Sequence, residues 1–399
     1  MKKLVSMVCI VAVSLVYSCK PSIEPSVEAT EVAATTELQE VMYRGIKAMV
    51  RADFPERALA PKTLVDYVEY LKGIQAPGAR LAASDIPKLS GQYVLDLMLE
   101  IKKGYPDLSK SPISDKDMKE IRKNFPTIVK EEDVWKNHDA VFHFYNDLIR
   151  EDALRKALKE GKPKTGSGRV ANFEPMDLLA ASPIYALWVG WPFIWMRRAQ
   201  TDADHRVVTD VNNGMIPTSV PLPIEADSAA KVNHERGNAY RHSVWNALGV
   251  KYMIDAGVSR NGALDKMRDV GTTYEAMRGA WRTFVAANDA LWNNPQQAFD
   301  NVPRSNETAM DLHNNLVGRT YMQNNISWGL FGLRRMPSYS QICDELRVRA
   351  VNASYYGPVE AFPNAIYAIH NPSDINDGFE RLKWWSWDHT YRSLIYIKP

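Results

Sequence analysis

The sequence predicts a mainly α-helical fold with two helical domains and a short β-like tail at the carboxyl end. Two observations support this prediction. Apolar residues recur every three or four positions along most of the chain, which is the spacing of an amphipathic helix. The chain has 399 residues, 45% of them hydrophobic, so it can bury more than one core. The inferred segments are a signal peptide at 1–18, a lipidated flexible tether at 19–36, an N-terminal helical domain at 37–158, a linker at 159–171, a second helical domain at 172–325 and an aromatic-rich extension at 326–399.

The amino-terminal residues predict export. Lys2 and Lys3 precede an apolar run, residues 4–16, which is shorter than the roughly 20 residues of a permanent membrane helix but suits a signal-peptide core. Val16-Tyr17-Ser18-Cys19 follows and resembles the cleavage site of a bacterial lipoprotein. This resemblance implies that Cys19 becomes a lipidated amino terminus that carries acyl chains such as palmitate. The alternative is an ordinary secretory signal cleaved near the same place.

Lipidation at Cys19 would make the membrane a partner of the protein. A single acyl chain anchors a protein only marginally, and the lipoprotein resemblance implies several chains on this cysteine. The expected location is therefore a bacterial membrane, either the outer membrane or a periplasm-facing surface.

Cysteine usage agrees with this interpretation. The chain has three cysteines, of which Cys9 leaves with the signal and Cys19 takes the lipid. Cys343 then remains alone, so the mature chain forms no intramolecular disulfide. Its position in a helical pattern predicts a small buried apolar residue and not a nucleophile.

The charge balance excludes broad capture of anionic partners. The formal net charge is +2, from 49 basic and 47 acidic residues, and removal of Lys2 and Lys3 leaves the mature chain neutral. We therefore expect no nucleic-acid binding.

The N-terminal domain, residues 37–158, is predicted to be helical throughout. Val41, Ile46 and Val50 give the first apolar stripe, and residues 64–71 repeat the three-to-four spacing. No chemistry is visible in this domain.

Residues 159–171 have the Gly, Pro, Ser and Lys composition of a linker. Gly161-Lys162 is no phosphate loop, because Pro163 stands where that motif needs Ser or Thr.

The second domain opens with an aromatic segment. Residues 184–196 contain Trp188, Trp191 and Trp195 and are interrupted by Pro192. A core helix is favoured over a membrane-contacting surface, because large exposed apolar patches are uncommon. Residues 201–238 are then turn-rich and predict a long loop or packed irregular structure.

Two histidine motifs mark a candidate site. The first is Arg241-His242-Ser243-Val244-Trp245-Asn246, and the second is Met310-Asp311-Leu312-His313-Asn314-Asn315-Leu316-Val317-Gly318-Arg319. Helical spacing places Asn238, His242 and Asn246 in one polar row. At about 100° per residue, Asp311, Asn314, Asn315 and Gly318 share one side of the second helix, whereas His313 lies on its apolar side.

These residue types suit acid/base chemistry or ligand binding. The candidate catalytic residues are His242, Glu275, Asp311 and His313. The candidate binding residues are Arg241, Trp245, Asn246, Asn314, Asn315 and Arg319. A structural hydrogen-bond network that ties helices together is the alternative for the same residues.

At these motifs the chain resembles a family of bacterial helical domains of unknown function. The family has an Arg-His-x-x-Trp-Asn-Ala-Leu helix, matched at residues 241–248, and a Met-Asp-Leu-His-Asn-Asn-x-Val-Gly-Arg segment, matched at 310–319. The resemblance covers residues 173–325. A His-Glu pair of the family corresponds to Tyr274-Glu275 here, so a divalent metal cofactor, otherwise possible for such side chains, lacks one ligand. The resemblance implies no activity, and the metal and cofactor stay unknown.

Three functions remain open, of which an antibacterial or immunity role at the cell surface has no direct sign in the sequence. An exported lipoprotein meets lipids, peptidoglycan, glycans and peptides, and hydrolysis of one of these is the enzymatic hypothesis. The alternative is a noncatalytic envelope lipoprotein with a binding or scaffolding role. Aromatic residues near the carboxyl end support the alternative, because such clusters can stack on sugars; they are Trp384, Trp385, Trp387, His389 and Tyr391.

Overall fold

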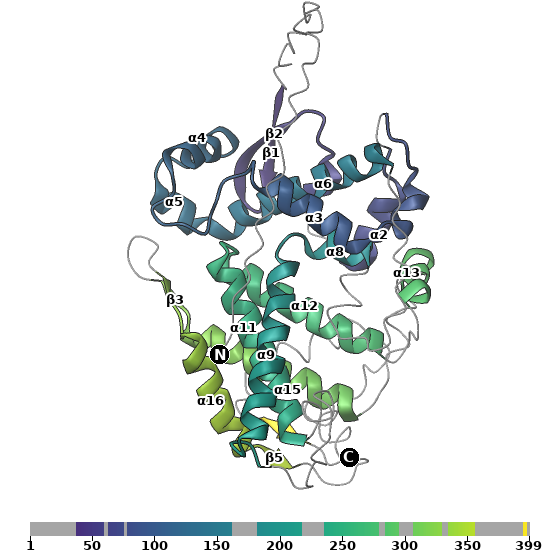
Figure 1. Cartoon of the computed structure of the whole chain (residues 1–399). Coiled ribbons are helices and arrows are strands. Elements are labelled where there is room, and N and C mark those ends of the chain that lie inside the picture. Colours follow the sequence, from purple (N-terminus) through teal and green to yellow (C-terminus); the bar gives the residue numbers. More distant parts are fainter. Residues whose placement is uncertain are drawn as a thin grey trace, which may run out of the picture. The chain divides into compact units, whose positions relative to one another are not determined.

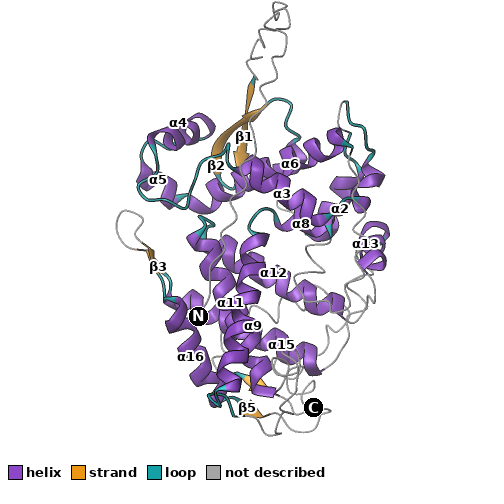
Figure 2. Cartoon of the chain, in the orientation of Figure 1, coloured by secondary structure: helices purple, strands orange, loops and turns teal. Residues whose placement is uncertain are grey.

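The computed structural model of the chain is mainly α-helical, as predicted (Figure 1). Short strands accompany the helices (Figure 2). The structure describes residues 37–59, 63–75, 78–161, 182–217, 235–278, 284–294, 306–328, 334–355 and 394–396. The predicted signal peptide, Cys19, the tether, most of the linker and the aromatic cluster at 384–391 lie outside the described residues.

The described chain begins with a β-hairpin and not with a helix. Strand β1, Leu38–Tyr43, pairs antiparallel with β2, Ile46–Arg51. Arg44 and Gly45 between them both have positive φ, as a two-residue hairpin turn of type I′ requires. The prediction that 37–158 is helical throughout was therefore wrong for these first residues.

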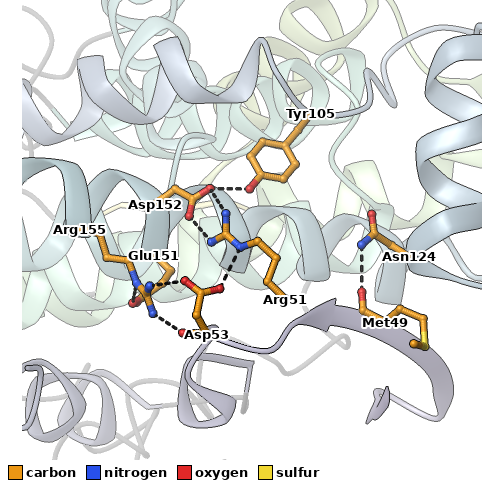
Figure 3. Close-up of polar contacts among 8 residues, drawn as sticks. All are labelled: Met49, Arg51, Asp53, Tyr105, Asn124, Glu151, Asp152 and Arg155. Carbon is orange, nitrogen blue, oxygen red and sulfur yellow. Dashed lines mark hydrogen bonds and ion pairs between the residues drawn. The ribbon is translucent and has the colours of Figure 1, made fainter. Parts of the chain in front are cut away.

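Polar contacts join the hairpin to helix α6, His138–Glu160. Arg51 at the end of β2 forms an ion pair with Asp152 of α6, with 2.6 Å between nitrogen and oxygen. Two residues further along, Asp53 accepts a hydrogen bond from Arg155 at 2.9 Å (Figure 3). The hairpin is thus joined to the helix by paired charges.

Shorter helices precede and pack around α6, which contacts α1, α3 and α5. They are α1 Glu56–Leu59, α2 Leu64–Lys72, the 3-10 helix η1 Ala83–Lys88, α3 Gly91–Lys102, α4 Asp115–Asn124 and α5 Glu131–Lys136. Helix α6 buries residues on all its faces, including Asn146, Asp147 and Glu151. Such all-round burial is typical of a helix inside a core.

The aromatic segment forms two helices that belong to the core, as predicted. Helix α8, Pro183–Val189, is buried along its whole length, and α9, Phe193–Asn212, follows after a break at Gly190–Pro192. The expectation of irregular structure from residue 201 was wrong, because α9 continues to Asn212. Charged side chains of α9 pair four residues apart, as Arg206 does with Asp210, and such pairs stabilise a polar helix.

Helix α11, Glu235–Asp255, lies at the centre of the second half of the chain. It packs against α9, α12 (Arg260–Arg278), α15 (Asn306–Asn325) and α16 (Tyr339–Val351). The predicted helices over both histidine motifs are therefore confirmed.

The remaining described elements are short. They are α13 Phe284–Asn293, β3 Ser327–Trp328, β4 Arg334–Arg335, β5 Ser354–Tyr355 and β6 Ile395–Tyr396. Strand β6 is the predicted β-like tail, and it pairs in parallel with β5. Cys343 on α16 is buried, as expected. Within the described part of the chain, none of the helices combines the length and hydropathy needed to span a membrane.

Candidate functional site

The two histidine motifs face each other across the contact between α11 and α15. Gly318 of α15 lies against the backbone of Ser243 in α11, so closely that a Cβ at position 318 would collide with the Ser243 carbonyl oxygen. Glycine is unfavourable inside a helix by roughly 1 kcal/mol relative to alanine. Here it lets the two backbones approach, and that approach brings the polar side chains of both motifs within hydrogen-bond distance.

The His242 ring is enclosed between the helices, with 1% of its surface exposed. Its Nδ1 lies 3.0 Å from Oδ1 of Asn315, and its Nε2 lies 3.2 Å from Oδ1 of Asp311. A terminal nitrogen of Arg241 lies 3.1 Å from the same Nε2. Both ring nitrogens are thus occupied by protein side chains.

This arrangement suits either protonation state of His242. In the neutral ring with its proton on Nδ1, that N–H donates to Asn315 and Nε2 accepts from Arg241. In the imidazolium, the Nε2–H donates to the Asp311 carboxylate. Neither state leaves a ring nitrogen directed at solvent, which is the position that a general base needs in order to reach a substrate.

A second polar residue of α11 holds the Asp311 carboxylate. Asn238 donates from Nδ2 to Oδ1 of Asp311 at 2.9 Å, and its own Oδ1 accepts from Arg241 at 3.0 Å. Asp311 is fully buried. Its carboxylate therefore contacts polar groups of α11 and does not face water.

The third residue of the row, Asn246, connects the remaining motif residues. It donates from Nδ2 to Oδ1 of Asn315 at 2.6 Å and accepts from a terminal nitrogen of Arg319 at 2.8 Å. Burial lowers the pKa of Arg319 to about 9, and the nearby Arg268 guanidinium adds to this shift. The guanidinium is still charged at neutral pH, so Asn246 supplies an acceptor to a buried cation.

Trp245 connects the same helix to α9. Its indole Nε1 donates to the backbone carbonyl of Met196 at 3.2 Å, and its ring centroid lies 6.4 Å from that of His242. The two rings meet edge to face. Trp245 therefore covers the histidine and fixes the spacing between α9 and α11.

The structure brings together most of the candidate residues but not all. His242, Asp311, Arg241, Asn246, Asn315 and Arg319 form the connected set described above. Asn314 is buried on α15, and His313 is half-buried on the same helix. Glu275 falls within α12, but its side chain is not among those described.

Two residues of the contact were seen in the sequence pattern without being assigned to the site. Asn238 belongs to the predicted polar row, and Gly318 belongs to the predicted side of the second helix. Helical spacing alone predicted their positions. Such spacing shows which residues share a helix face but not which residues of another helix contact that face. Among the described residues, no group of three or more His, Cys, Asp or Glu side chains is placed to hold a metal ion.

The fold and the site define a mainly α-helical protein in which the residues of two sequence motifs join helices α11 and α15 by hydrogen bonds. Residues 225–337 match the model of a family described as a domain of unknown function, DUF6973. The match contains both motifs, so the resemblance to an uncharacterised domain family is confirmed, with a later start and a later end than expected. No curated protein and no solved structure matches the chain.

Proposed function

We propose that this chain is an exported, membrane-anchored lipoprotein with a noncatalytic binding or scaffolding role in the bacterial envelope. The motif residues then form a structural network that holds α11 to α15. The observation that supports this proposal most directly is that His242 uses both ring nitrogens on protein partners, Asn315, Asp311 and Arg241, at 1% exposure.

Hydrolysis of an envelope component has less support from the same geometry. An acid/base histidine needs one nitrogen oriented by the protein and the other directed at the reacting group. In this chain both nitrogens of His242 are oriented by the protein. The buried Asp311 is likewise engaged by Asn238 and His242.

Replacement of His242 by alanine tests the structural role. We expect the free energy of unfolding to fall by about 3 kcal/mol or more, because breaking a buried charged or hydrogen-bonded pair leaves its partners uncompensated. A catalytic histidine predicts the opposite pattern: unchanged or raised stability, with activity lost on a panel of lipids and peptidoglycan. His313→Ala is the matched control, since His313 belongs to the same motif but is half-buried.

Replacement of Cys19 by serine tests the anchor. In bacteria fed labelled palmitate, we expect the full chain to take up label and to fractionate with membranes, and Cys19→Ser to do neither. Ser18→Thr, which keeps the cysteine, serves as the control for handling of the signal. Unlabelled chain released into the soluble fraction would instead support the secretory alternative.

A further inference from the structure

A second polar site lies between α6, α8 and α12, and none of the motif residues lines it. A cavity of about 250 Å³ is lined by residues of α6 and α12 and by the end of α8. One water needs only about 10–15 Å³ of such space, so the cavity has room for a ligand of several non-hydrogen atoms. The side chains of Arg44 and Asp265 at its lining keep 31% and 40% exposure, which marks the side open to solvent.

Asn146 of α6 lines this cavity and has unsatisfied polar atoms. It is 1% exposed, and neither its amide nitrogen nor its amide oxygen has a hydrogen-bond partner among the described residues. Gly190 holds the side chain in place: it has a φ of 85°, and a Cβ there would collide with the Asn146 amide. A buried amide that lacks partners lowers stability, so its presence calls for a ligand or bound water.

Two cations beside Asn146 have donors to spare. Arg150 donates to the carbonyl of Trp188 at 2.8 Å and to Asp147, yet its Nε has no partner among the described residues. Lys266 of α12 donates to the carbonyl of Val189, and an ammonium has three donors. Both cations therefore cap the end of α8 and still have N–H groups available.

The neighbouring acids do not use up these donors. Asp147 already accepts from the Tyr43 hydroxyl at 2.8 Å as well as from Arg150. Asp265 and Asp269 both pair with Arg268. Burial lowers the pKa of Lys266 to about 7, the direction expected when no carboxylate lies directly against an ammonium.

We propose that the cavity binds a small carboxylate with a hydroxyl or amino group on the adjacent carbon. The carboxylate oxygens accept from Arg150 Nε and Lys266 Nζ, and the adjacent group pairs with Asn146, whose amide offers both a donor and an acceptor. Charge-assisted hydrogen bonds from arginine and lysine are the usual means of recognising carboxylates. The inference depends neither on lipidation nor on the role of His242.

Calorimetric titration of the full chain in detergent tests the ligand class. The probes are lactate and glycine, and the control is propionate, which keeps the carboxylate but lacks the adjacent group. We expect saturable binding of lactate or glycine and at least tenfold weaker binding of propionate. Absence of saturable binding by both probes, or equal binding of propionate, would overturn the proposal.

The variant Asn146→Leu separates a ligand site from a structural pocket, because leucine has nearly the same shape as asparagine. We expect it to abolish lactate and glycine binding and to raise the melting temperature of the ligand-free protein. The matched control is Asn124→Leu: Asn124 is also buried, but its amide donates to Met49 and accepts from Tyr145 (Figure 3 shows the Met49 contact), so this change should lower the melting temperature. A lower melting temperature for Asn146→Leu, including failure to fold, would mean that bound water satisfies the amide and that the cavity is structural.

Discussion

Gly318 of α15 lies in direct contact with the backbone of Ser243 in α11, where no larger residue fits without movement. This contact sets the separation of the two helices. The distances from His242 to Asp311 and Asn315, both close to 3 Å, depend on it.

Substitution of Gly318 by alanine should therefore destabilise the protein. Overpacking costs about 1–3 kcal/mol, which exceeds the gain of up to about 1 kcal/mol that alanine normally brings to a helix. Gly271 of α12 is the control, because a Cβ there would lie 3.4 Å from the nearest atom, an ordinary contact. Denaturant unfolding should show a lower free energy of unfolding for Gly318→Ala and no loss for Gly271→Ala. Equal stabilities of the two variants would show that the close contact between α11 and α15 does not require glycine at position 318.

The contact between His242 and Asp311 should be energetically coupled. His242→Ala and Asp311→Ala each remove one partner of the same contact, so the double variant should lose less stability than the two single losses added together. We expect a coupling energy of about 1–3 kcal/mol, the range for residues that share one hydrogen-bond network. A double-mutant cycle by denaturant unfolding measures it, and purely additive losses would argue against the network.

Replacement of Asn246 by alanine should lower the free energy of unfolding by about 1.5–3 kcal/mol. The expected loss in stability is large because Asn246 accepts a hydrogen bond from the charged Arg319. Hydrogen bonds to charged groups contribute more to stability than hydrogen bonds between neutral groups. The control is Asn325, the last residue of α15, whose amide makes one half-buried hydrogen bond to the carbonyl of Tyr321. If Asn325→Ala proved as costly as Asn246→Ala, the charge of Arg319 would not be the cause.

Lys266 should make stability depend on pH. Its pKa is about 7 in the folded chain and 10.5 ordinarily, so between these values the unfolded chain binds a proton that the native chain does not. The free energy of unfolding therefore rises with pH in this window, by up to about 1.4 kcal/mol per pH unit, and is independent of this group below it. Burial is the main cause; the surrounding charges are Arg150 and Arg44, which lower the pKa, and Asp147 and Asp269, which raise it.

The Lys266→Met variant isolates this contribution, because every other titrating group is common to both proteins. The free energy of unfolding of the wild type, relative to that of the variant, should increase from pH 7 to pH 10. Parallel curves would show that Lys266 has an ordinary pKa. Lys251→Met, at the ion pair with Asp255, is the control for the loss of a lysine side chain.

Helical spacing was enough to predict which residues of the two motifs share a face. Asn238, His242 and Asn246 all contact α15, as the four-residue repeat indicated. The pattern could not give the depth of burial, because α11 packs against four other helices and its polar row is as enclosed as its buried apolar residues.

The hairpin at residues 38–51 escaped prediction for a local reason. The turn is of type I′, which needs positive φ at both central positions and whose usual signal is Asn-Gly or Asp-Gly. Here Arg44 takes a φ of 46° before Gly45, so the turn has only half of that signal. Val41, Ile46 and Val50 then fitted a helical stripe equally well.

The cavity beside α8 could not be predicted at all. Asn146 and Arg150 are four residues apart on α6, but Lys266 comes from α12 more than a hundred residues later. No motif joins them. Tertiary packing alone makes them neighbours, and a periodic pattern within one helix contains no information about it.

The polar row of α11 finds its partners 73 residues further along the chain, from Asn238 to Asp311 and from His242 to Asn315. During synthesis, α11 is therefore made before the residues that satisfy its polar row, and the long intervening segment must close before the two helices meet. The same contacts that stabilise the finished protein thus impose an order of assembly, in which the polar row of α11 stays hydrated until α15 packs against it.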